Sequence, residues 1–162
     1  MYKRQPFALA LAKAAKKAGI SVVLETSGYA QTECFLEMTP FCDCFYFDCK
    51  ADPALHSACT GVEDTLILQN LDAILRMDAA VVLRCPIVPG ANLTEAYLDK
   101  IVALAQKYPN MRGISLLPYH KAGASKSIRI GKRAQTVFAT PSPQEMAQIR
   151  HEIRQRVAIP VF

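Results

Sequence analysis

The sequence lacks the long apolar run and the leader that would place the protein in or across a membrane. No apolar stretch of the 162 residues approaches the roughly 20 residues that span a bilayer, so we expect no membrane partner. No charged, apolar and small-residue leader opens the chain, which favours a cytoplasmic protein with reduced cysteines. Internal repeats and low-complexity linkers are absent too, and the length suits a single domain over residues 1–162.

Metal-type cysteine spacing is also absent. The chain has six cysteines, which include one C-x-C pair and no C-x2-C pair. Zinc ribbons and ferredoxin-like clusters both need the longer spacing. We therefore interpret the cysteines as core or incidental thiols rather than as a metal site.

A strong charge bias is missing as well. Lys and Arg number 19 against 14 Asp and Glu, which leaves a net charge of +5. The excess is spread along the chain, with slight concentrations in residues 120–133 and 150–156. Such a balance is typical of a solvated surface, so we expect no nucleic-acid partner.

Strand and helix signals alternate along the chain. Pro6 in a first turn and Gly19 after a run of Ala, Leu and Lys predict a helix over residues 6–19. The segment 51–61 is short and polar and could be helix or loop. Alternation of this kind predicts an α/β fold with a parallel sheet. The expected strands are 20–25, 44–50, 79–90 and 113–119, and the further expected helices are 63–78, 95–108 and 142–156.

Polar side chains follow the expected strands where each one ends, and in parallel α/β folds these ends form the active face. Strand alternation puts Asp48 and Lys50 on one side and Cys49 on the other. Singly, each residue has a structural explanation as an ion pair, a snorkelling side chain or a turn residue. Their recurrence at one level favours a ligand site. The residues are Glu25, Thr26 and Ser27, then Asp48 and Lys50, then Arg84, then His120.

Five segments taken together resemble a known family. They are "GISVVLETSGY", "FYFDCKADPALHSACTG", "ILQNLDAIL", "VVLRCPIVPGAN" and "ISLLPYHKAGASK", and the match runs from Phe7 to about Lys126. In this order and spacing the chain resembles the glycyl-radical-enzyme activating enzymes, radical S-adenosylmethionine proteins of the pyruvate formate-lyase activating enzyme type.

The resemblance implies a partial (β/α)6 barrel, with about four of the six strands in this chain. It also implies S-adenosylmethionine bound at a four-iron four-sulfur cluster and cleaved to a 5′-deoxyadenosyl radical, which takes hydrogen from a glycine of a partner glycyl radical enzyme. A flavodoxin or ferredoxin type protein would donate the electron. The cofactors supply this chemistry and the protein positions them.

The resemblance also assigns roles to single residues. It implies cofactor contacts for Thr26, Asp48, Lys50, Arg84 and His120. Glu25, Thr26 and Asp48 would hold a monovalent cation beside the methionine carboxylate, through the oxygen ligands that a hard cation prefers. The family carries Asp where this chain has Glu25. The longer side chain shifts the carboxylate by about a bond length, which weakens the expectation of a cation site.

Two family motifs do not occur in the chain. They are the C-x3-C-x2-C loop that binds the cluster and the Gly-Gly-Glu-Pro that follows it. The register of the match places both upstream of Met1. We therefore expect a C-terminal fragment that is inactive alone, in which residues 1–4 are not the natural start. We also expect self-association through the apolar edge strand at residues 20–25.

Two other functions fit the same residues. One is a barrel lyase or aldolase in which Lys50 forms a Schiff base and Asp48 or His120 moves protons. The other is a non-enzymatic domain that binds a nucleotide or peptide. For the activating-enzyme function, residues 52–61, with His56 and Thr60, are either a contact with the glycyl radical enzyme or a helix-turn linker.

Overall fold

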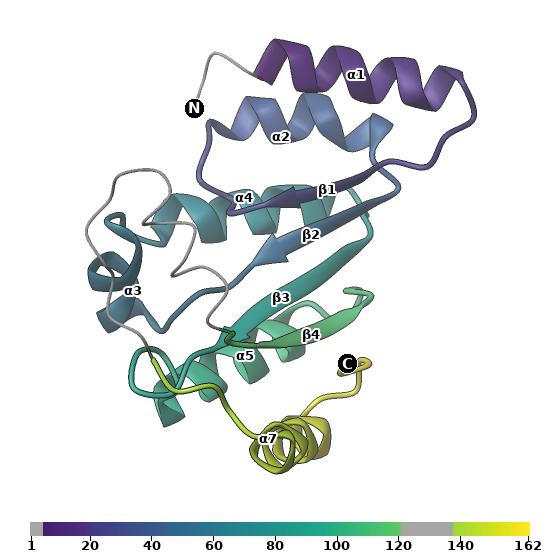
Figure 1. The fold of residues 1–162 in the computed structure, drawn as a ribbon. Helices are drawn as coiled ribbons and strands as arrows, with labels where there is room; N and C mark the ends of the chain where they lie inside the picture. The colour runs from purple at the N-terminus through teal and green to yellow at the C-terminus, as the bar shows by residue number, and fades with distance from the viewer. Residues whose placement is uncertain (1–4, 121–137) are drawn as a thin grey trace.

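The computed structural model describes residues 5–120 and 138–162, which form one four-stranded parallel sheet with helices around it (Figure 1). The spatial order of the strands is the order of the chain. Each crossover therefore leads to the neighbouring strand, as in successive βα units of a barrel. The strands are β1 (Val23–Thr26), β2 (Cys44–Asp48), β3 (Val81–Ile87) and β4 (Gly113–Pro118).

Helices occupy the connections between the strands. In Figure 1, α4 and α5 lie behind the sheet, while α1 and α2 lie beyond β1 and α7 lies below β4. The helices are α1 (Gln5–Lys17), α2 (Thr32–Met38), α3 (Pro53–Thr60), α4 (Thr65–Arg76), α5 (Glu95–Lys107) and α7 (Pro143–Arg156), with a short 3-10 turn, η2 (Thr39–Phe41), after α2.

One face of the sheet is the core and the other is open. Along β3, Val81, Leu83, Cys85 and Ile87 are fully buried, whereas the residues between them are only partly buried. Successive side chains of a strand point to opposite faces, so the buried set lies on the side of α4 and α5. The half-exposed residues of β2 and β3 thus share the opposite, open face.

Local sequence signals fix the ends of several helices. The Asp52 side chain accepts hydrogen bonds from two backbone N–H groups at the start of α3, and Gly61 ends that helix with a φ of 81°. Thr94 caps α5 through the N–H of Tyr97. Ser142 and Glu145 form a capping box at α7.

The two edges of the sheet differ. Beyond β4, residues 160–162 run alongside the strand and exchange backbone hydrogen bonds with Ile114. On the other side, β1 pairs only with β2 within the described ranges. The edge at β1 is therefore open, while the edge at β4 is covered.

The expected fold is confirmed, with two differences in detail. The expected strand 20–25 begins only at Val23, and α2 and η2, between β1 and β2, were not predicted from the sequence. The polar segment 51–61 is largely helical, as α3. Residues 1–4, expected to be a non-native start, lie outside the described residues, and so does most of the basic stretch 120–133. The single-domain assignment stays a prediction.

Hydropathy gives one further result. Among the helices that the structure describes, none is both long and apolar enough to cross a membrane.

Gly28 is the tightest backbone position near the site. It has a φ of 77°, and a Cβ placed on it would lie 2.3 Å from the Phe47 ring and 2.8 Å from Ile67. Gly19 has a similar φ of 74° but nothing within 4 Å of such a Cβ. A comparison of the two glycines therefore distinguishes the cost of backbone strain from the cost of side-chain crowding.

We predict that Gly28→Ala destabilises the protein far more than Gly19→Ala does. Gly19→Ala should cost about 1 kcal/mol because an L side chain is strained at positive φ. Gly28→Ala should lose about 2 kcal/mol more because Phe47 must move. Urea unfolding followed by circular dichroism measures both, and equal losses would contradict the crowding at Gly28.

Candidate functional site

Two ion pairs occupy the open face of the sheet. Arg84 of β3 pairs with Glu25 of β1, and the Lys50 ammonium lies 3.1 Å from the Asp48 carboxylate. The contact between Asp48 and Lys50 agrees with the prediction that they share one side, and Cys49 between them is buried in the core. Four of the expected site residues thus form two neighbouring charge pairs.

The sequence predicted that Arg84 lies at the end of its strand, and this prediction is wrong. Arg84 is the fourth of the seven residues of β3, because this strand continues past the end of β2. In the sheet, however, Arg84 is paired with Asp48, the last residue of β2. The two residues therefore lie at the same level of the open face although they differ in position along their own strands.

The Arg84 guanidinium is the most constrained charge of this face. Its side chain is 20% exposed, and its buried Nη1 has no well-formed hydrogen bond to any described residue, although it touches the Glu25 carboxylate. Tyr46 lies beside it, with the ring centroid 6.0 Å from the guanidinium carbon. A buried guanidinium with unused donor capacity is suited to an anionic ligand group.

Thr26 lies on the other face of the sheet. Strand alternation turns it away from Glu25, and it lines a groove of about 610 Å³ between α1, β1 and α2. Its hydroxyl accepts a hydrogen bond from the Gly28 N–H at 3.0 Å. The structure therefore does not bring the Thr26 side chain to the charge pairs.

His120 lies beyond the end of β4 and is exposed. The preceding residue, Tyr119, is tied to β3 by a backbone hydrogen bond to the Ile87 carbonyl. This bond fixes the point at which the chain leaves β4 at the carboxyl end of the sheet. His120 thus emerges at the expected end, outside the two ion pairs.

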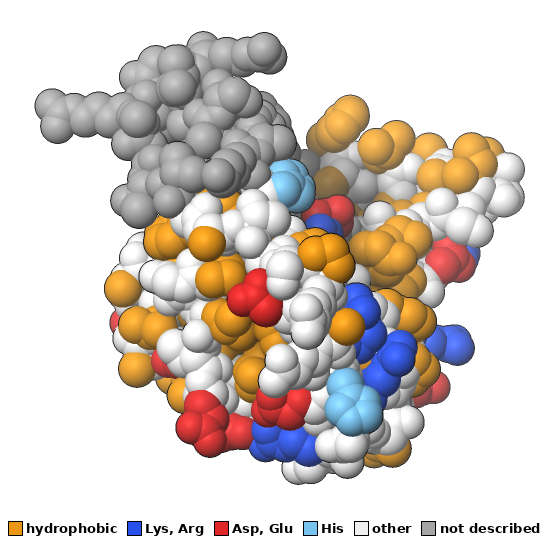
Figure 2. Space-filling view, turned by 60° about the horizontal axis from the view of Figure 1, so that its bottom comes forward, with side chains coloured by type: hydrophobic (Ala, Val, Ile, Leu, Met, Phe, Trp, Pro, Cys, Tyr) orange, Lys and Arg blue, Asp and Glu red, His pale blue; other side chains and the backbone are white. Residues whose placement is uncertain are grey.

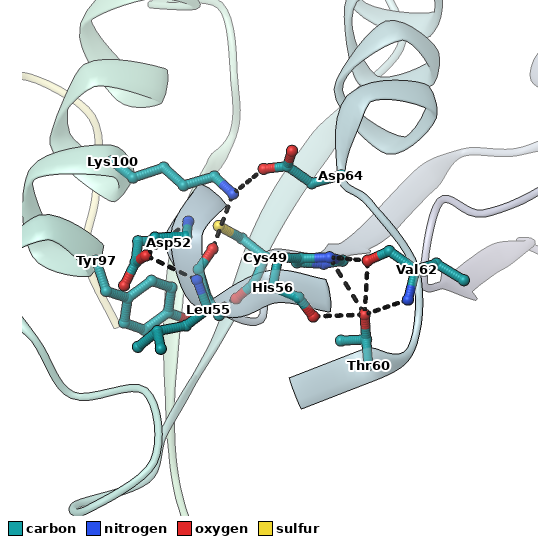
Figure 3. Close-up of polar contacts among 11 residues, drawn as sticks. Cys49, Asp52, Leu55, His56, Thr60, Val62, Asp64, Tyr97 and Lys100 are labelled. Carbon is teal, nitrogen blue, oxygen red and sulfur yellow. Dashed lines mark hydrogen bonds and ion pairs between the residues drawn. The ribbon is translucent and has the colours of Figure 1, made fainter. Parts of the chain in front are cut away.

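His56 is not available as a surface contact, although residues 52–61 as a partner contact stay a prediction. The side chain is buried, and its Nδ1 lies 2.8 Å from the Val62 carbonyl (Figure 3). The Thr60 hydroxyl donates to the His56 carbonyl at 2.7 Å. Both side chains therefore stabilise the end of α3 and the turn after it.

Several buried polar residues near the site were missed by the sequence analysis. Their signal was a polar residue inside an otherwise apolar segment, as in "ILQNLDAIL" for Asn70 and "VPGAN" for Asn92. Both are almost fully buried, and each makes three side-chain hydrogen bonds. Buried amides of this kind fix loops in place because an unpaired one is costly.

The described residues do not fit an iron–sulfur cluster. They hold no group of three or more His, Cys, Asp or Glu side chains placed to bind a metal ion. Cys49 and Cys85 are buried, and burial raises the pKa of the Cys85 thiol well above its usual value. As for a cation, the carboxylates of Glu25 and Asp48 are already paired with Arg84 and Lys50.

Comparison with known proteins gives several sequence relatives. No protein-family model matches the chain. It is 39% identical over 128 residues to the choline trimethylamine-lyase activating enzyme of Oleidesulfovibrio alaskensis, covering 76% of this chain and 41% of that enzyme. It is 36% identical over 135 residues to the indoleacetate decarboxylase activating enzyme of Tractidigestivibacter scatoligenes, covering 81% of this chain and 41% of that enzyme. The homologues of this chain are glycyl-radical-enzyme activating enzymes.

A third relative covers nearly the whole chain. The isethionate sulfite-lyase activating enzyme of Nitratidesulfovibrio vulgaris is 31% identical over 160 residues, which are 95% of this chain and 50% of that enzyme. These relatives agree with the resemblance to activating enzymes described above. The chain spans only 41–50% of the length of the three relatives.

The fold also matches a crystal structure. A domain of the pyruvate-formate lyase-activating enzyme from Bacteroides vulgatus superposes with a TM-score of 0.79 over 98% of this chain and 91% of that domain. The sequence identity is 22%, so the match shows the fold alone. The parallel sheet is thus the partial barrel fold expected from the sequence.

Proposed function

We propose that this chain is the carboxyl-terminal part of a glycyl-radical-enzyme activating enzyme and that the open face of its sheet binds S-adenosylmethionine. The observation that carries the proposal is the largely buried Arg84 guanidinium, which lies level with Asp48 and whose Nη1 contacts the exposed Glu25 carboxylate without a well-formed hydrogen bond. A zwitterionic ligand offers a carboxylate to Arg84 and Lys50 and an ammonium or sulfonium group to Glu25 and Asp48. Homology to activating enzymes supports the choice of this ligand.

Thr26 and His120 have weaker support as ligand contacts. His120 emerges at the correct end of the sheet, whereas the Thr26 side chain lies on the other face. A monovalent cation at Glu25 and Asp48 belongs to the same proposal. It would bind only when the ligand carboxylate draws Arg84 and Lys50 away from these two side chains, and the Thr26 hydroxyl, on the other face, would not take part.

The cluster and the protein partners belong to the whole enzyme. We propose that the thiolates for a four-iron four-sulfur cluster come from outside this chain. The partner is a glycyl radical enzyme, proposed from the motifs to be of the pyruvate formate-lyase type, and a flavodoxin or ferredoxin type protein supplies the electron. The three named relatives are activating enzymes of two lyases and a decarboxylase, so a panel of such enzymes is the appropriate test of the partner.

No described contact favours the Schiff-base alternative. The Lys50 amino group lies 3.1 Å from the Asp48 carboxylate, so it would have to leave this contact to attack a carbonyl substrate. The third alternative, a non-enzymatic domain, makes the same ligand prediction as an inactive fragment.

We predict that the chain binds S-adenosylmethionine in the millimolar range, about −4 kcal/mol. Arg84→Met should weaken this binding at least about tenfold, because it removes a charge-assisted contact. Isothermal titration calorimetry or ligand-detected NMR measures the affinity. Arg112→Met is the matched control, because Arg112 is exposed and precedes β4 at the opposite end of the sheet. An equal loss of affinity in both variants would contradict a binding site on the open face.

We also predict that the chain alone generates no radical. After anaerobic treatment with iron, sulfide and a reductant it should form no 5′-deoxyadenosine from S-adenosylmethionine, because its described residues hold no cluster site. Translation of the gene upstream of Met1 should continue in frame into a C-x3-C-x2-C loop and a Gly-Gly-Glu-Pro. A stop codon directly upstream, or 5′-deoxyadenosine above the level of an iron-free control, would contradict the proposal.

The open edge of β1 supports the self-association expected from the sequence. Val23 is 52% exposed on this strand, and Ile20, just before it, is 60% exposed. Figure 2 shows further hydrophobic side chains at the upper right. Phe7 and Leu11 of α1 are exposed as well. An unpaired apolar edge strand readily pairs with another chain.

We predict that Val23→Lys reduces this self-association. A charged side chain on an edge strand opposes pairing with a second strand. Sedimentation equilibrium over a wide concentration range should show association of the unsubstituted chain and less in the variant. Met77→Lys is the control, because Met77 is also exposed but lies after α4. A strictly monomeric unsubstituted chain would contradict this part of the proposal.

A further inference from the structure

Three consecutive backbone carbonyls after β2 accept hydrogen bonds from side chains of one region of the chain. The Tyr97 hydroxyl donates to Cys49 at 2.5 Å, the Asn92 amide to Lys50 at 2.6 Å, and the Lys100 ammonium to Ala51 at 2.8 Å. The three donors, Asn92, Tyr97 and Lys100, are here called the carbonyl clamp. All three come from α5 or the loop that precedes it. The middle carbonyl belongs to Lys50, a proposed ligand contact.

Asn92 is the member that joins two strand ends. Its amide nitrogen also donates to the Pro86 carbonyl of β3 at 2.7 Å, and its oxygen accepts from the Val88 N–H at 2.9 Å. The residue is 3% exposed and has all its main hydrogen-bonding capacity used. It therefore fixes the backbone of Lys50 relative to β3, the strand that carries Arg84.

The other two members are anchored in the core. Tyr97 is fully buried, and burial raises the pKa of its hydroxyl, which keeps it a proton donor. Lys100 also pairs with Asp64 at 2.7 Å, and both side chains are 11% exposed (Figure 3). Asp52 follows Ala51 in the chain. Its side chain accepts a hydrogen bond from the Thr94 hydroxyl at 3.0 Å and also caps α3. The whole segment 49–52 is thus held from the α5 side.

We propose that the carbonyl clamp, and Asn92 in particular, positions Lys50 against Asp48 and so sets the charge arrangement of the open face. The clamp holds the main chain while the side chain of Lys50 is left free to reach Asp48 and a ligand. None of the three residues touches the open face itself, so they are positioning residues. This inference rests on the proposed function only where a ligand is concerned. The contact between Lys50 and Asp48 exists without one.

Asn70 provides a matched control within the same fold. Its amide donates to the carbonyls of Gly28 and Ala30 at 2.8 Å each, and its oxygen accepts from the Thr32 hydroxyl at 2.7 Å. Asn70 and Asn92 are therefore equally buried amides with three side-chain hydrogen bonds apiece. Asn70 holds the loop after β1, and Asn92 holds Lys50, the second residue after β2, which is proposed to bind the ligand.

The first test needs no ligand. The chain is labelled with ε-13C-lysine, and the NMR signal of Lys50 is assigned through its loss in Lys50→Arg. The position of this signal is then compared in Asn92→Ala and Asn70→Ala. Both substitutions should lower the urea midpoint by similar amounts. Only Asn92→Ala should move the Lys50 signal by more than its line width, toward the position of an unpaired lysine. Tyr97→Phe removes one hydroxyl with little change of shape and should move the same signal if Asn92→Ala fails to fold.

The second test is a double-mutant cycle on binding of S-adenosylmethionine. Asn92→Ala should weaken binding about tenfold in the unsubstituted chain, but less than about twofold when Lys50→Met is already present, because the clamp acts through Lys50. Asn70→Ala should have the same effect in both backgrounds. Any interaction between Asn70 and Lys50 as large as that of Asn92 would overturn the inference.

The two tests separate the inference from the proposed function. An unchanged Lys50 signal in both Asn92→Ala and Tyr97→Phe overturns the positioning role, whatever the ligand result. A chain that binds no S-adenosylmethionine removes support from the proposed function, and the lysine spectrum still decides whether the clamp positions Lys50.

Discussion

The strict alternation of β3 is the constraint on which the site depends. Four of its seven side chains are fully buried against the helices, so Arg84 between them can only point to the open face. The pairing of Asp48 with Arg84 in the sheet then brings the end of β2 to the same level. A shift of this register by one residue would put a guanidinium in the apolar core, at a cost of several kcal/mol. Core packing and charge placement therefore enforce each other.

Side chains from α4, α5 and the loop before α5 fix the conformation of the loops at the carboxyl ends of β1 and β2. Asn70 holds the loop after β1, and the carbonyl clamp holds the segment after β2. In both places the chain leaves the regular sheet, and backbone carbonyls that would otherwise be unpaired in a buried region find side-chain donors. Long-range polar contacts thus define loop conformation where strand pairing has ended.

Much of this arrangement could be predicted from the sequence, because strand and helix patterns are local. The alternation of apolar residues gave all four strands, and the two-residue spacing of Asp48 and Lys50 correctly put them on one side. The helix α2 escaped because "TECFLEM" is short and lacks a capping side chain. Thr26 was misplaced because β1 extends one residue past its expected end at Glu25, and strand alternation then turns Thr26 to the other face. The burial of His56 depends on tertiary packing, which a pattern along the chain does not contain.

The asymmetry between the two edges connects the fold to the charges. Residues 160–162 cover β4, whereas β1 is open, and Glu25, which belongs to β1, is 64% exposed while its partner Arg84 is 20% exposed. An ion pair with one exposed member is weakly held, because water competes for the carboxylate. Arg84 carries most of its desolvation cost whether or not Glu25 stays in place. A ligand carboxylate that replaced Glu25 would therefore lose little of an existing interaction and would satisfy a guanidinium that the fold has already buried.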